Sequence, residues 1–284
     1  MKHSYLILTT LAALSLPAVS HGQVLVADNF TNSTGTDAAT VSNTQSSGVG
    51  TYDRILTQSA SSGMTVTTVS GFGTGNVLSL GNSSNNYYRE FNGGATTSLN
   101  SLSLGQTLSL SFDARFSAVP FSGDNFSFGF INDSSPDSIL YANVDLTGSS
   151  YVSEFRYREG SFNMSDAGGS LIVGSGWTEP ATAANTNYTF AIDVTRELNG
   201  DWTIAYYRDS ELLSSIALTV SSSVITAMGD VDITGIAFRH ANTPGATTYI
   251  DNVNVAIATI PEPGFTGMGL GLVALCGLLY RRRR

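Results

Sequence analysis

The sequence feature that most constrains the fold is a strict alternation of apolar and polar residues over short segments. Between residues 108 and 116 every second residue is apolar, and Phe126, Phe128 and Phe130 repeat the pattern in the next segment. Such alternation is typical of a β-strand with one buried face, and no segment has a clear 3.6-residue period. The sequence therefore predicts an all-β, antiparallel sandwich with jelly-roll-like connections.

Short β-rich runs continue along the chain and are separated by turns rich in glycine, asparagine and serine. The predicted strands cover residues 24–30, 52–57, 64–69, 77–80, 87–91, 108–116, 125–131, 139–144, 151–157, 171–173, 188–194, 202–206, 211–218, 233–240 and 248–257. Asn199 and Gly200 between two alternating runs predict a hairpin. Residues 221–228 are compatible with a helical turn.

The two ends of the chain differ in character from the segment between them. Lys2, an apolar run over 5–16 and a stretch of small residues predict a secretory signal peptide over 1–23. Near the other end a Pro-Glu-Pro triplet precedes an apolar run and four arginines. We expect one β-sandwich domain over 24–259 and a separate segment over 260–284.

This last segment resembles a PEP-CTERM sorting signal. The residues that carry the resemblance are Pro261, Glu262, Pro263, Arg281, Arg282, Arg283 and Arg284. The resemblance implies recognition by an exosortase-type membrane enzyme, transient anchoring by a single transmembrane helix, and delivery to the cell envelope or the extracellular matrix. An ordinary C-terminal membrane anchor is the alternative interpretation.

Composition excludes several functions for residues 24–259. The only cysteine, Cys276, lies outside this span, so the domain has no disulfide and no thiolate metal site. His240 is its only histidine, which excludes a multi-histidine zinc site, and we expect this residue to be structural. The span contains no lysine and the whole chain has a formal net charge of −9, so nucleic acid is not an expected partner.

A second resemblance covers residues 108–256. The order of LSLSFDARF, NFSFGFI, SEFRYREG, ITGIAFRH and TYIDNVNV is similar to that of a concanavalin A-like lectin/glucanase sandwich. Laminarinase-type members carry Glu-x-Asp-x-x-Glu on one strand, whereas the segment from Glu154 to Glu159 lacks the central acid. We therefore predict no catalytic residues, and interpret Glu154, Arg156 and Arg158 as a solvated face with cross-strand ion pairs.

Two kinds of binding site remain as hypotheses. Asp28 and Asp251 would meet if the first and last strands of the domain pair, and their oxygens would suit a structural calcium ion. Asp251 could instead bond the backbone. The aromatic residues proposed to bind a glycan are Trp177, Tyr87, Tyr88 and Tyr207. A core or strand-pairing role is the alternative for each of them.

The functional prediction combines these points. We expect an exported, non-enzymatic protein of the cell envelope or extracellular matrix that is able to bind a polysaccharide. A glycoside hydrolase or lyase of the same fold, and a purely structural surface adhesin, are the alternatives.

Overall fold

The computed structural model describes most of the predicted sandwich domain. The described residues are 23–30, 42–43, 50–51, 54–55, 64–80, 86–91, 96–118, 125–132, 138–148, 152–159, 164, 170–172, 174–229, 232–241 and 247–259. The predicted signal peptide, apart from its last residue, and the predicted sorting segment lie outside these residues. Among the described residues, no helix has the length and apolar character needed to cross a membrane.

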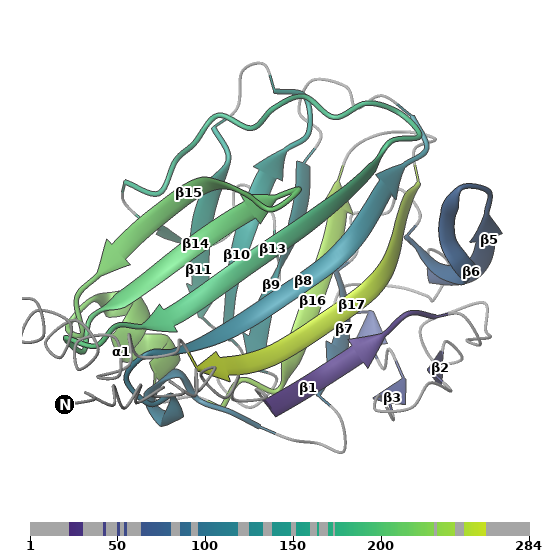
Figure 1. The fold of residues 1–284 in the computed structure, drawn as a ribbon. Coiled ribbons are helices and arrows are strands. Elements are labelled where there is room, and N and C mark those ends of the chain that lie inside the picture. Colours follow the sequence, from purple (N-terminus) through teal and green to yellow (C-terminus); the bar gives the residue numbers. More distant parts are fainter. Residues whose placement is uncertain are drawn as a thin grey trace, which may run out of the picture. The chain divides into compact units, whose positions relative to one another are not determined.

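One antiparallel sheet, here called sheet I, contains both the first and the last described strands. Its order is β15 (Glu211–Leu218), β14 (Trp202–Arg208), β13 (Asn187–Arg196), β8 (Gln106–Phe116), β17 (Thr248–Thr259), β6 (Phe72–Leu80) and β5 (Met64–Val69). In addition β1 (Gln23–Asp28) pairs with β17. Figure 1 shows β15, β14, β13, β8, β17 and β1 side by side, with β17 between β8 and β1.

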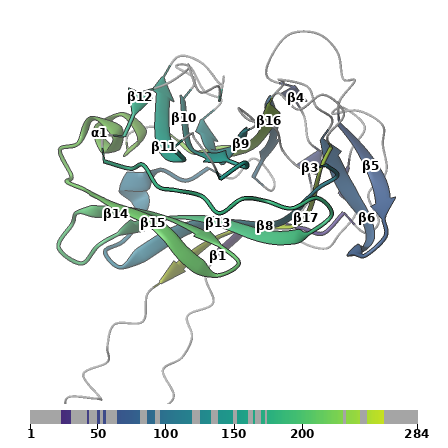
Figure 2. The same cartoon turned by 90° about the horizontal axis from the view of Figure 1, so that it is seen from above.

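The second antiparallel sheet, sheet II, forms the other layer. Its order is β12 (Ser170–Leu171), β11 (Glu154–Glu159), β10 (Ser138–Asp145), β9 (Asn125–Asn132), β16 (Gly235–Ala241), β7 (Asn86–Glu90) and β4 (Arg54–Ile55). A short pair, β2 (Ser42–Asn43) and β3 (Gly50–Thr51), and the helix α1 (Ser223–Gly229) complete the described elements named here. Figure 2 shows the two sheets as separate layers.

The core between the layers is dominated by phenylalanine. Phe112 on β8 meets Phe128 and Phe238 of sheet II edge-on, at centroid distances of 4.8 and 4.9 Å. It also stacks against Phe190 of its own sheet at 5.7 Å. The inward residues of β8 and β9 are those that the alternating pattern assigned to one face, and they are almost fully buried. Each such aromatic pair adds about 0.5–1.5 kcal/mol beyond the burial of its area.

The predicted two-sheet antiparallel sandwich is thus confirmed. The hairpin at Asn199-Gly200 joins β13 to β14, with Gly200 at φ 90° and a bond from Glu197 N to Asp201 O of 2.8 Å. The predicted helical turn is α1. Many strand boundaries differ from the predictions by a few residues; for example, β6 begins at Phe72, and β11 begins only at Glu154.

Candidate functional site

The outer face of sheet II carries a cluster of polar and charged side chains. On β11, Phe155 is fully buried, whereas the alternating residues Glu154, Arg156 and Arg158 remain partly exposed. Pairing places Arg156 opposite Tyr141 on β10. Because strands alternate their faces, Glu154, Arg156 and Arg158 all lie on the outer face of sheet II together with Tyr141.

The neighbouring strands extend this polar cluster. Asn143, opposite Glu154, accepts a hydrogen bond from Ser127 Oγ on β9 at 2.8 Å. Arg239 on β16 pairs with Ser127, and both donate to the carbonyl oxygen of Met164, at 3.0 and 3.2 Å. Met164 therefore covers the middle of the face, and Ser127, Asn143 and Arg239 are buried beneath it.

Tyr141 occupies the centre of this arginine face, by which we mean the outer face of sheet II around Tyr141. Burial raises the pKa of Tyr141 to about 12, while the charges of Arg156, Arg158 and Arg239 act in the opposite direction. Three guanidinium groups thus act electrostatically on one phenol. The charge of Glu154, which pairs with Arg156, acts in the same direction as burial.

A glycine makes room for the tyrosine. Gly129 on β9 pairs with Tyr141, and a Cβ added at Gly129 would lie 2.8 Å from Tyr141 Cβ and 2.0 Å from the carbonyl oxygen of Leu140. Both contacts are far shorter than van der Waals distances. The close approach of β10 to β9 at the centre of the arginine face therefore requires glycine.

The one ion pair of this face that the described residues contain joins Arg156 to Glu154. Both belong to β11, so this interaction lies within one strand, and the predicted cross-strand ion pairs stay a prediction. Asp145, two residues beyond Asn143 on β10, adds a second carboxylate to the same face; it is buried and accepts from Thr147 N and Oγ1. The described part of the face therefore combines guanidinium groups with two carboxylates.

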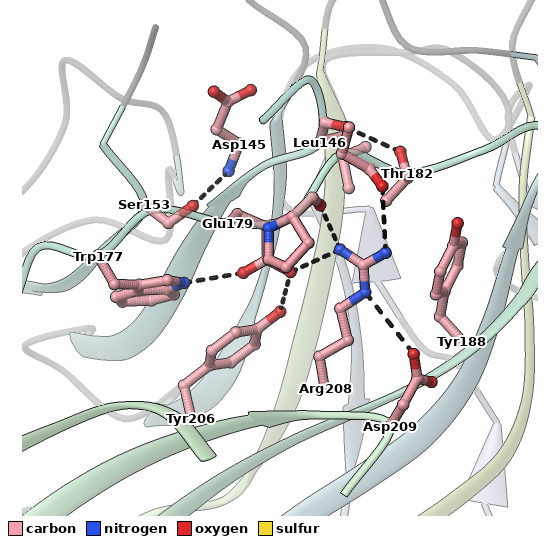
Figure 3. A network of polar contacts seen from close by, with 12 residues as sticks. Asp145, Leu146, Ser153, Trp177, Glu179, Thr182, Tyr188, Tyr206, Arg208 and Asp209 are labelled. Atoms are coloured by element: carbon pink, nitrogen blue, oxygen red, sulfur yellow. Dashed lines mark hydrogen bonds and ion pairs between the residues drawn. The ribbon is translucent and has the colours of Figure 1, made fainter. Parts of the chain in front are cut away.

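A second polar network is buried at the side of the sandwich where β11 and β14 lie (Figure 3). Glu179 Oε2 accepts from Trp177 Nε1 at 2.8 Å, and Oε1 accepts from Tyr206 OH at 2.9 Å and from an Arg208 guanidinium nitrogen at 3.0 Å. Glu179 is 1% exposed. Burial raises its pKa, and the three hydrogen bonds act in the opposite direction.

This network fastens the segment 174–186 to both sheets. Trp177 exchanges backbone hydrogen bonds with Ser153 beside β11, and Thr182 donates to Leu146 O beyond the end of β10. Arg208 of sheet I donates to the backbone carbonyl oxygens of Pro180 and Ala181. The Glu179 network therefore has a structural role, because it holds the segment 174–186 against both sheets.

Trp177, predicted as a glycan-binding residue with a core role as the alternative, lies in the segment 174–186. It is 7% exposed and stacks on Tyr206 at a centroid distance of 4.7 Å. Its indole N–H donates a hydrogen bond to Glu179 Oε2. The structure thus gives Trp177 a packing role and leaves it no open ring face for a sugar.

The other predicted aromatic residues have different positions. Tyr207 on β14 is partly exposed on the outer face of sheet I, where it lines a recess. Tyr87 and Tyr88 lie on β7, opposite Phe238 and Ala237 of β16, and their side chains are outside the described part of the structure. Their proposed glycan role stays a prediction.

The two acids proposed for calcium are brought close together. The first and last strands pair as expected, with Asp28 opposite Val253. Asp28 Oδ1 accepts from Phe30 N, and Asp251 Oδ1 accepts from Asn252 N at 2.9 Å. Burial raises the pKa of Asp251 to about 6, the Asn252 N–H opposes this, and nearby negative charges add to it. Those charges belong to Asp113 and Asp28.

These acids do not by themselves establish a metal site. Within the described ranges, no group of three or more histidine, cysteine, aspartate or glutamate side chains is arranged to hold a metal ion. The backbone bond of Asp251 is the alternative role considered for it, and that bond is present. The calcium site stays a prediction, to be tested by chelation.

His240 is buried, as expected for a structural histidine. It is 1% exposed, and its Nδ1 lies 2.8 Å from Thr248 Oγ1. Burial, followed by the charge of Arg239, lowers the pKa of His240 to about 4. The ring is therefore neutral at physiological pH.

Comparisons with known proteins give likenesses of structure only. No family model matches the chain, and no curated protein matches it in sequence. An endo-1,3-β-glucanase from Streptomyces sioyaensis is similar at 12% identity and a TM-score of 0.49, over 87% of this chain and all of that one. The alginate lyase Aly36B is similar at 13% identity and 0.46, over 81% of this chain and 95% of the lyase.

A carbohydrate recognition domain is also among the similar structures. That of Emp46p, in its potassium-bound form, has 8% identity and a TM-score of 0.46, over 69% of this chain and 86% of that domain. All three scores are below 0.5. The sandwich architecture of the chain rests on its own strand pairing.

Proposed function

We propose that residues 24–259 form an exported, non-enzymatic sandwich of concanavalin A-like type that binds an acidic polysaccharide along the arginine face of sheet II. The observation that carries the proposal is that Arg156 and Arg158 alternate along β11 on the outer face of sheet II and are partly exposed. Arginine presents a planar fork of donors that matches a carboxylate or sulfate group. Uronic acid or sulfated sugars are therefore the ligand class that this face suits.

Two arginines of this face, Arg156 and Arg158, are partly exposed. Arg156 keeps 16% of its side chain exposed beside Glu154, and Arg158 is also partly exposed. Arg239 is nearly covered and bonded to the carbonyl oxygen of Met164, so it contributes its charge rather than a direct contact. A polysaccharide would run along β11, where only the two-residue strand β12 lies further out.

Replacing Arg158 by glutamine is expected to weaken binding of alginate or polygalacturonate about tenfold. The loss corresponds to one charge-assisted hydrogen bond, about 1.5 kcal/mol. Titration calorimetry of the purified full-length protein at low salt measures it, and affinity should fall as salt is raised because exposed charges are screened. Arg115→Gln is the matched control, because Arg115 lies on β8 of sheet I and donates to Ser70 O.

The alternatives give different results in the same experiment. A hydrolase or lyase would release oligosaccharides during the titration, with unsaturated ends in the case of a lyase. A purely structural adhesin would bind neither polymer at any ionic strength. Equal binding by the wild type and the Arg158 variant would contradict the arginine face as the site.

We also propose that the chain is exported and then sorted by an exosortase-type enzyme acting at Pro261-Glu262-Pro263. The sequence resemblance of residues 260–284 supports this proposal. In a host lacking the exosortase, the protein should remain in the membrane fraction at its unprocessed mass. Mass spectrometry of the fractions decides the point, and identical processing with and without the enzyme would favour an ordinary anchor.

A further inference from the structure

The outer face of sheet I, on the other side of the sandwich from the arginine face, contains a recess of about 290 Å³. Its lining residues are Ser109, Ser111, Thr189, Ala191, Asp193 and Tyr207, with Ser210 also contributing. They belong to three adjacent strands, β8, β13 and β14, and to the turn that follows β14. A recess of this volume lies at the small end of the range for small-molecule pockets.

Strand pairing explains why the surface is hollow at this point. Ser109 pairs with Asp193, and Ser111 pairs with Ala191, so small side chains form the floor. On the next strand Tyr207 lies directly opposite Ala191. Because Tyr207 is much larger than the neighbouring serine and alanine residues, it forms one wall of the recess.

The polar groups of the recess leave hydrogen-bonding capacity for a ligand. Asp193 Oδ1 accepts from Ser109 Oγ at 2.5 Å. Among the described residues, nothing bonds the other carboxylate oxygen. Burial raises the pKa of Asp193, and the hydrogen bond from Ser109 acts in the opposite direction. A ligand hydroxyl donating to it would supply the missing interaction.

We propose that this recess binds one neutral pyranose unit, with the apolar face of the sugar ring against Tyr207 and hydroxyl groups donating to Asp193. An aromatic ring beside a carboxylate and several hydroxyls matches the mixed apolar and hydroxyl surface of a sugar. An acidic sugar is disfavoured, because its carboxylate would face Asp193. Tyr207 contributes its ring face and is still partly exposed.

This second site goes beyond the acidic polysaccharide assigned to sheet II. The two sites lie on the outer faces of opposite sheets and select sugars of different charge. A single domain could then join an acidic polymer on one face to a neutral glycan on the other. Neither site shares a residue with the other, so each can be removed separately.

Saturation-transfer NMR on the purified full-length protein tests the recess directly. The probes are the methyl glycosides of glucose, galactose and mannose, with methyl glucuronide as the acidic comparison. We expect transfer to at least one neutral glycoside. Ala191→Leu, which fills the floor, should abolish that transfer, and Tyr207→Ala should weaken neutral-glycoside binding about tenfold. Transfer to the glucuronide, which suits the arginine face, should be the same in both recess variants and in the wild type.

Two controls separate this site from general effects. Tyr249→Ala alters a partly exposed tyrosine on β17 of the same sheet, away from the recess, and should leave transfer unchanged. Arg158→Gln should reduce only the binding of the acidic polymer. Absence of transfer to every neutral probe, or unchanged transfer in both recess variants, would overturn the proposal whatever the outcome for the arginine face.

Discussion

Replacing Glu179 by alanine is expected to lower the free energy of unfolding by about 3–5 kcal/mol, the usual cost of breaking a buried ion pair from one side. The carboxylate binds Trp177, Tyr206 and Arg208 at once. Its removal leaves the Arg208 charge buried, with a side chain 7% exposed. The remaining partners are backbone carbonyls, the mostly exposed Asp209 at 3.8 Å and the Tyr188 ring at 4.2 Å. Loss of the one buried counter-charge is among the most costly changes a core can undergo.

Urea unfolding monitored by tryptophan fluorescence measures this loss. Glu211→Gln is the control, because Glu211 is an exposed acid at the start of β15 and should change stability by less than about 0.5 kcal/mol. Glu179→Gln should also destabilise, since its amide nitrogen would face the Trp177 N–H, a donor against a donor. Stability equal to the wild type in both Glu179 variants would show that segment 174–186 is held by packing alone.

Replacing Asp251 by asparagine is expected to stabilise the protein at neutral pH, by at most about 3 kcal/mol, when calcium is absent. The pKa of this carboxyl is raised from 3.8 to about 6, so the folded state holds the proton more tightly than the unfolded state. Each pKa unit corresponds to about 1.4 kcal/mol. Asparagine removes the charge and can still accept the bond from Asn252 N.

The sign of the pH dependence follows from the same shift. Between pH 3.8 and about 6 the folded state binds more protons at Asp251, so its contribution to stability is greatest in acid and is lost as pH rises. His240 acts the other way: its pKa is lowered from 6.5 to about 4, so its contribution is present above 6.5 and lost as pH falls. The Asp251→Asn variant should therefore differ from the wild type by little near pH 4 and most above pH 6.

Calcium supplies the second arm of this experiment. If Asp28 and Asp251 hold a calcium ion, added calcium should raise the melting temperature of the wild type and chelator should lower it again. The Asp251→Asn variant should not respond to either. If neither calcium nor chelator changes the melting temperature of the wild type, the calcium prediction is wrong. The prediction of the pH dependence would not be affected.

The sheets were predictable from the sequence because alternation is a local property. Phe126, Phe128 and Phe130 must share a face whatever their partners are, and the prediction of that face was confirmed. Boundaries were less accurate where polar residues join a strand through pairing alone. Residues 72–76, for example, extend β6 without apolar alternation because they form a hairpin with β5.

The sites were less predictable, because they depend on which strands become neighbours. Arg239 joins Arg156 and Arg158 only through the order β11, β10, β9, β16, which no local pattern reveals. Trp177 was proposed to bind a glycan because its packing partners are not evident from the local sequence. Tyr206 belongs to β14 of sheet I, and Glu179 lies two residues further along the chain. A glutamate next to a proline in an otherwise uncharged stretch was the available signal of a buried carboxylate.

The position of β17 has a consequence for how the domain can be made. This last strand pairs with β8 along ten residue positions and also with β1 and β6, so it lies inside sheet I rather than at its edge. Earlier strands cannot complete that sheet before residues 248–259 have been synthesised and, under the proposed export, have crossed the membrane. Secretion would then deliver an unfinished chain whose folding is completed on the far side by its final strand, immediately next to the segment proposed for sorting.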